Sequence, residues 1–233
     1  MEKLNIVYMG TPDFSVGPLE KLIKKYNVVM VVTQPDKEIG RKKEIKFSPV
    51  KECAIKNNIK VFQPSKIREN YKEILDEKPD IIITCAYGQI IPKDLLDYPK
   101  YGCINVHASL LPKYRGAAPI QWCILNGEKK TGVTSMQMDI GLDTGDMLVK
   151  RETDIGENET SAELFERLAE MGGEVLLETI DKINMLPQVE KVKDKGYNIL
   201  YLTEYVDEFA IKSLMEYDGK KFVNVSEENL DLD

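Results

Sequence analysis

An asparagine and a histidine stand two residues apart at the end of a short apolar segment. Residues 102–106 (GCINV) form that segment, and Asn105, Val106 and His107 close it. Residues two apart on an extended strand project to the same side, so the carboxamide and the imidazole would face one space. His107 is the only histidine in the chain. We interpret the pair as a candidate site; the alternative is an ordinary core or surface histidine.

A later segment supplies the acids that such a pair would need. Residues 139–146 (DIGLDTGD) hold three aspartates and two glycines. Their spacing does not fit an EF-hand loop, and we expect no metal. We interpret the segment as a turn between strands that holds one carboxylate against His107. That carboxylate would orient the ring and favour its imidazolium form.

A carboxamide, an imidazole and a carboxylate together suit acyl transfer to an amine. The Asn and His donors would stabilise the oxyanion of a tetrahedral intermediate. The His–Asp pair, directly or through water, would take the proton of the amine. The amine itself attacks, so this chemistry needs no serine or cysteine nucleophile.

The apolar segments predict the framework that positions these residues. Near-continuous apolar strands that alternate with helices are typical of an α/β fold, a doubly wound and mostly parallel sheet of the Rossmann-like kind. The expected strands are 3–9, 28–33, 60–62, 80–86, 102–106, 131–138 and 146–151, and the expected helices are 15–25, 49–57, 66–77, 117–126 and 160–183. Ligands bind outside the carboxyl ends of such strands, where Asn105 and His107 fall.

Two local patterns sharpen this prediction. Thr160 and Glu163 form a capping box that would start the last helix, and Gly172 and Gly173 would bend or split it. The first turn, GTPDFS at 10–15, lacks the GxGxxG glycines that cradle a dinucleotide. We therefore exclude an NAD or FAD site.

Composition is that of a soluble globular protein, with 42% hydrophobic and 30% charged residues. No apolar run is long enough for a bilayer, and no signal peptide is evident, so we expect a cytoplasmic monomer with no membrane partner. The four cysteines form no CxxC pair, which favours buried structural roles. Net charge is −7, yet residues 37–46 (KEIGRKKEIK) hold five basic and two acidic residues. This segment is either a solvated loop or a contact for a phosphate backbone.

Longer motifs carry a family resemblance over residues 1–184. These are MGTPDFSV at 9–16, VVTQPDK at 31–37, SPVKE at 48–52, VFQP at 61–64, AYGQIIP at 86–92, NVHASLLPKYRGAAPIQ at 105–121 and MQMDIGLDTGDM at 136–147. Together they resemble the methionyl-tRNA formyltransferases. Sugar and purine formyltransferases share the N-x-H and the later Asp but lack GAAPIQ beside QMDxGLDTGDM.

The resemblance implies a reaction and a set of residues. The formyl donor would be 10-formyltetrahydrofolate, and the acceptor the α-amino group of initiator methionyl-tRNA. Asn105, His107 and Asp143 match the family's catalytic trio. Ser109, Leu110, Leu111 and Pro112 match its folate-contacting segment, and Arg41, with Lys42 and Lys43, matches the basic loop that reaches the tRNA. Here GRKK stands where the family usually has GRGKK, and the lost glycine restricts the backbone.

The end of the chain departs from the family. The resemblance implies a basic barrel-like tRNA-binding domain there, but residues 185–233 carry six basic and eleven acidic residues. This segment instead resembles a fragment of an Hsp90-type chaperone middle domain, and its pattern predicts a small βαβ-like appendage: a strand at 198–203, a helix at 204–217 and a strand at 221–225. A natural fusion, an assembly artefact and an engineered chimera would all produce this sequence.

Three functional hypotheses follow. The first is formyl transfer to methionyl-tRNA, weakened by loss of the basic domain. The second is formyl transfer to a small amine such as an amino sugar. The third is a catalytically impaired chimera.

Overall fold

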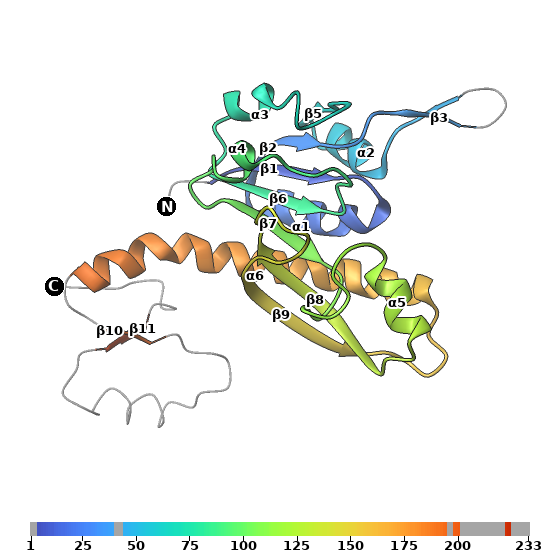
Figure 1. Cartoon of the computed structure of the whole chain (residues 1–233). Coiled ribbons are helices and arrows are strands. Elements are labelled where there is room, and N and C mark those ends of the chain that lie inside the picture. The colour runs from blue at the N-terminus through green and yellow to red at the C-terminus, as the bar shows by residue number, and fades with distance from the viewer. Residues whose placement is uncertain (1–3, 40–43, 195–197, 201–221, 225–233) are drawn as a thin grey trace. The chain divides into compact units, whose positions relative to one another are not determined.

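A seven-stranded sheet forms the centre of the catalytic unit, in the order β5-β2-β1-β6-β7-β8-β9. In this computed structural model the described residues are 4–39, 44–194, 198–200 and 222–224 (Figure 1). The strands of the sheet are β1 (Asn5–Gly10), β2 (Asn27–Val32), β5 (Lys60–Phe62), β6 (Ile81–Cys85), β7 (Cys103–His107), β8 (Lys130–Gln137) and β9 (Met147–Asp154). The first five strands of this order, from β5 through β2, β1 and β6 to β7, pair in parallel. Strand β8 pairs antiparallel with both β7 and β9. The expected mostly parallel α/β fold is confirmed.

Helices connect the strands much as the sequence predicted. They are the 3₁₀ turn η1 (Asp13–Ser15), α1 (Val16–Lys25), α2 (Pro49–Lys56), α3 (Lys72–Asp76), α4 (Lys93–Leu96), α5 (Pro119–Leu125) and α6 (Ser161–Asp194). The prediction of a helix over 66–77 was wrong in its first half. The backbone N–H of Ile67 donates to the side chain of Gln89 at 2.8 Å, so this stretch follows the loop after β6 instead of a helical ladder.

The inner strands β1 and β6 are buried on both faces, as their apolar residues require, whereas most residues of the edge strand β9 are exposed or half-buried. One face of β1 points Val7 and Met9 into a core that also contains Ile74 of α3 and Leu95 of α4. Tyr8, between them in sequence, is fully buried, and its hydroxyl donates to the carbonyl of Ser15 at 2.7 Å. Burying both faces leaves the carboxyl ends of the strands as the place where polar side chains reach solvent.

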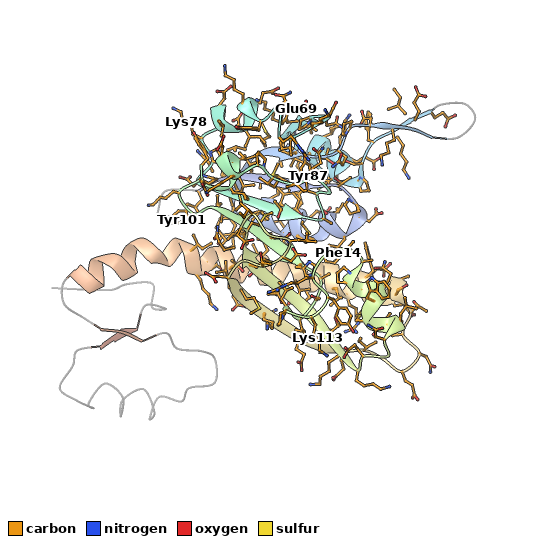
Figure 2. The ribbon with its side chains drawn as sticks, viewed as in Figure 1. Phe14, Glu69, Lys78, Tyr87, Tyr101 and Lys113 are labelled. Carbon is orange, nitrogen blue, oxygen red and sulfur yellow. The ribbon has the colours of Figure 1, made fainter. Side chains whose placement is uncertain are left out.

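Helix α6 runs without interruption through Gly172 and Gly173, so the expected split is absent. Both glycines let α6 approach its neighbours: a Cβ at Gly172 would lie 3.3 Å from a methyl group of Val106. The capping box is confirmed, because Thr160 Oγ1 accepts from the Glu163 backbone at 3.3 Å and the Glu163 carboxylate accepts from the Thr160 N–H at 2.9 Å. Phe14, labelled in Figure 2, meets Phe165 of α6 edge to face at 5.4 Å.

The basic segment 37–46 is framed by a β-hairpin, which the sequence had not predicted. Strands β3 (Lys37–Ile39) and β4 (Glu44–Lys46) pair antiparallel, with Lys37 opposite Lys46. In Figure 1, β3 extends away from the central sheet. Ile45 on β4 is 68% exposed, so the hairpin contributes little to the core.

All four cysteines are free and buried: Cys53, Cys85, Cys103 and Cys123. Burial raises the pKa of the Cys85 and Cys103 thiols to about 12. The prediction that these residues are buried small side chains is confirmed.

The chain forms two compact units, Met1–Thr179 and Ile180–Asp233. In the second unit, β10 (Asn198–Leu200) and β11 (Phe222–Asn224) pair in parallel. The helix predicted at 204–217 lies outside the described residues.

Candidate active site

The carboxyl ends of β6 and β7 bring the predicted catalytic residues together. Asn105 and His107 lie on β7, and Asp143 comes from the segment between β8 and β9. The Asn105 side-chain amide donates to Asp143 Oδ1 at 3.2 Å. His107 Nδ1 lies 3.6 Å from Asp143 Oδ2, and the His107 and Asp143 side chains are only 9% and 12% exposed. The structure therefore brings together the predicted trio, although Asp143 lies 36 positions after His107 in the chain.

The hydrogen bonds of His107 assign its tautomer. Its Nε2 lies 2.8 Å from the backbone carbonyl oxygen of Tyr114. A carbonyl can only accept, so Nε2 carries the proton of the neutral ring. In the neutral ring Nδ1 would then have a lone pair, and it lies beside Asp143 at a distance too long for a hydrogen bond. A nitrogen in this state can accept a proton, and the carboxylate would stabilise the imidazolium that forms.

The Asp143 carboxylate is held from several sides. The backbone N–H of Gly116 donates to its Oδ2 at 2.7 Å. Asp143 itself has φ 51, a left-handed conformation that Asp tolerates better than most residues. Asp139 has a different role, because its Oδ1 accepts from the Gly141 N–H at 2.9 Å and from Thr144 Oγ1 at 2.7 Å. One acid of the loop faces the histidine, and another closes the turn.

Three partners of the trio were missed by sequence reasoning. Thr84 is the last residue but one of β6, is 3% exposed, and donates to Asn105 Oδ1 at 3.0 Å, which orients the carboxamide. A polar residue at the end of an apolar strand was the signal for it. The backbone groups of Tyr114 and Gly116 left no side-chain signal, although the glycine in RGAAP marks an unusual backbone, with φ 86 at Gly116.

The predicted folate segment follows directly after His107. The Ser109 side chain is fully buried, and its hydroxyl donates to the Lys113 carbonyl at 2.7 Å. Leu110, Leu111 and Pro112 line a hollow of about 490 Å³ with residues of β8 and β9. None of the trio lines this hollow, and the contact of the segment with folate stays a prediction.

A second hollow, of about 500 Å³, lies at the loop that follows β6. Gly88, Gln89 and Ile90 form one wall, and Lys66, Arg68 and Glu69 the other. Ile90 is 75% exposed, so this loop presents an apolar side chain beside two cations. The predicted tRNA contacts Arg41, Lys42 and Lys43 lie outside the described residues.

Within the part of the chain that the structure describes, no group of three or more His, Cys, Asp or Glu side chains could hold a metal ion. Over the same residues, no helix has both the length and the apolar character to cross a bilayer.

The family follows from a match over most of the chain. Residues 4–180 match the model of the formyl transferase family. The chain belongs to this family, whose match contains the sheet and all three residues of the trio.

Among curated proteins, the methionyl-tRNA formyltransferase of Clostridium tetani is 53% identical over 200 residues, which is 83% of this chain and 64% of that protein. The methionyl-tRNA formyltransferase of Acetivibrio thermocellus is 56% identical over 183 residues. The chain spans less than two thirds of the length of these curated relatives.

Solved structures share the fold. An N-formyltransferase from Helicobacter canadensis, in complex with folinic acid and dTDP-3-aminofucose, has a TM-score of 0.61 and 25% identity; the match covers 77% of this chain and 64% of that one. Residues 175–233 separately match the model of the Hsp90 protein family.

Proposed function

We propose that this chain transfers the formyl group of 10-formyltetrahydrofolate to the α-amino group of methionyl-tRNA. The observation that carries the proposal is the trio of Asn105, His107 and Asp143 in a chain of this family. The acceptor is inferred from the names of curated relatives at 53% and 56% identity. The donor is inferred from the family and from the folinic acid of a related structure.

Four residues of the chain, Asn105, His107, Asp143 and Thr84, would each have a separate role in the reaction. The bound donor supplies an electrophilic formyl carbon. The second N–H of the Asn105 carboxamide, the one not engaged by Asp143, would donate to the formyl oxygen as negative charge develops there. His107 Nδ1 would take the proton of the attacking amine, and the Asp143 carboxylate would stabilise the resulting imidazolium. As the tetrahedral intermediate collapses, the bond between the formyl carbon and N10 of the donor would break, and the imidazolium would return its proton to N10, which releases tetrahydrofolate and the formylated amine. Thr84 would keep the carboxamide turned so that its N–H groups point outward.

Either hollow has features that fit a folate donor. The hollow at Gly88–Ile90 offers Lys66 and Arg68 for the carboxylates of the donor. The hollow at Leu110 and Pro112 offers apolar walls, with lysines at its rim. A raised KM for the donor in Arg68→Ala but not in Leu110→Ala would place the donor at the first hollow. The reverse would support the predicted folate segment.

The acceptor is tested with a panel: methionyl-tRNA, free methionine and a nucleotide-linked amino sugar, each with 10-formyltetrahydrofolate. We expect formylation of methionyl-tRNA and its reduction by about 10² or more in His107→Ala, the usual range for a lost general base. Turnover of the amino sugar alone would show that the acceptor is a small amine. Equal turnover by the wild type and His107→Ala would refute the proposed site.

A further inference from the structure

Tyr114 links the buried histidine to the rim of the molecule. Its carbonyl oxygen accepts from His107 Nε2 at 2.8 Å. Its backbone has φ 59, in the left-handed region, which is unfavourable for a residue with a Cβ. Other contacts must therefore hold this peptide in place, since a relaxed Tyr114 would turn its carbonyl away from the ring.

Those contacts converge on Glu128, in the turn between α5 and β8. The Tyr114 hydroxyl donates to Glu128 Oε1 at 2.8 Å. Lys113 Nζ also lies 3.0 Å from Glu128 Oε1, and Asn126 Nδ2 donates to the Tyr114 hydroxyl at 3.1 Å. The hydrogen bond from Tyr114, and then the bond from Lys113, lower the pKa of Glu128, so this acceptor is a carboxylate at neutral pH.

The turn that carries Glu128 is itself anchored. The Glu128 backbone N–H donates to the Cys123 carbonyl at 3.0 Å, and Gly127 adopts φ 65 to make this return possible. On the other side, Ser109 Oγ donates to the Lys113 carbonyl. Lys113 and Tyr114, the two residues that contact Glu128, are therefore held on one side by Ser109 and on the other by the anchored turn of Glu128. Lys113, labelled in Figure 2, lies in the segment between β7 and α5.

We propose that Glu128 is a positioning residue for the reaction: through the Tyr114 hydroxyl it holds the Tyr114 carbonyl against His107 Nε2. The ring is thereby kept in the tautomer whose bare Nδ1 faces Asp143. Two acceptors flank the ring, Tyr114 O at 2.8 Å from Nε2 and Asp143 Oδ2 at 3.6 Å from Nδ1. When the Tyr114 carbonyl moves away from Nε2, the Asp143 carboxylate remains as the acceptor, and the ring proton moves from Nε2 to Nδ1. The consequence for the rate rests on the proposed function; the consequence for the tautomer does not.

The test uses the fact that the chain has a single histidine. Protein labelled with ¹⁵N-histidine gives one pair of imidazole nitrogen signals, whose shifts distinguish the two neutral tautomers. The variants are Glu128→Ala, which removes the acceptor, and Tyr114→Phe, which removes only the donor hydroxyl. Glu128→Gln keeps an acceptor oxygen. Glu77→Ala is the matched control, because Glu77 has the same 27% side-chain exposure as Glu128 and pairs with a lysine, Lys60, at 2.8 Å, but lines neither hollow.

We expect Glu128→Ala and Tyr114→Phe to shift the ring toward the Nδ1–H tautomer by the same amount. In the full chain, kcat should fall about 10-fold, with little change in the KM for the donor or for the acceptor. This loss is a part of the rate enhancement of ~10²–10⁴ that a positioned general base supplies. Glu128→Gln should restore most of the wild-type imidazole shifts and most of kcat, and Glu77→Ala should match the wild type in both.

Unchanged imidazole shifts in Tyr114→Phe, which keeps the aromatic ring and so tests the idea even where Glu128→Ala does not fold, would overturn the proposal. So would a Glu128→Gln variant as impaired as Glu128→Ala. A wild type that transfers no formyl group to any amine would count against the proposed function and leave the tautomer measurement to decide this inference.

Discussion

Replacing Asp143 by Asn removes the charge that faces the histidine. Asn is nearly isosteric and tolerates the left-handed backbone of position 143, where φ is 51. Its side-chain oxygen can still accept from the Gly116 N–H. Its Nδ2 then faces the Asn105 amide, so the change removes the hydrogen bond from Asn105 together with one negative charge at 3.6 Å from His107 Nδ1.

The size of the effect follows from that distance. At 3.6 Å, a carboxylate and an imidazolium attract by about 1.2 kcal/mol in water and about 4.6 kcal/mol at an effective dielectric constant of 20, or roughly 10-fold to 2 × 10³-fold in rate. The two side chains are about nine-tenths buried, which places the pair nearer the upper value. We expect kcat to fall by roughly 10² to 10³, with the KM for folate nearly unchanged.

Asp139→Asn is the matched control in the same loop. Its Oδ1 accepts two hydrogen bonds, from Gly141 and Thr144, and a carboxamide oxygen can accept both. We expect activity within about 3-fold of wild type, since neutral hydrogen bonds are kept and no charge faces the site. Steady-state formylation of methionyl-tRNA by both variants decides the matter. Equal losses in the two variants would mean that the acids of this loop act through its structure and that the charge argument is wrong.

Three further predictions concern other parts of the chain. Asn105→Ala should reduce kcat by about 10² with little loss of folate binding, because it removes a donor to the developing oxyanion; equilibrium binding of a folate analogue separates the two. Arg41→Ala should weaken tRNA binding and make the salt dependence shallower by about one phosphate contact, as filter binding across a salt series would show. An unchanged slope would mean that Arg41 does not meet the tRNA backbone. Gly145→Ala should destabilise the loop and abolish activity, because a Cβ there would lie 1.8 Å from the Gln137 carbonyl oxygen; a wild-type melting temperature would contradict this.

The sequence was sufficient for the elements with a continuous apolar pattern. Strands β1, β2 and β6 were predicted within two residues at each end, because both faces of a parallel sheet must be apolar. The start of α6 was predicted from Thr160 and Glu163, whose side chains cap it. The β3–β4 hairpin was missed because its charged residues form no apolar alternation, and α3 was overextended because its pattern does not reveal the bond from Ile67 to Gln89.

The same division holds at the site. That Asn105, His107 and Asp143 lie together could be predicted because their side chains are polar groups next to strand ends, and the chain has a single histidine for an acid to face. The choice of Asp143 over Asp139 came from the family resemblance. Tyr114 and Gly116 act through their backbone, and a peptide carbonyl or N–H has the same appearance at every position of a sequence. Their contribution depends on φ values of 59 and 86, which only the structure gives.

The buried cysteines have a practical consequence for following the molecule in solution. A thiol reagent attacks the thiolate, so Cys85 and Cys103, with pKa about 12 and no exposed surface, are protected by both accessibility and ionisation. Cys53 and Cys123 lie elsewhere in the same unit and are at most 6% exposed. Alkylation of the native chain would then proceed only as fast as the unit opens, and mass spectrometry would resolve which part opens first. A cysteine introduced on the exposed surface would react long before them, so a fluorescent or spin label could be attached there without removing a native residue.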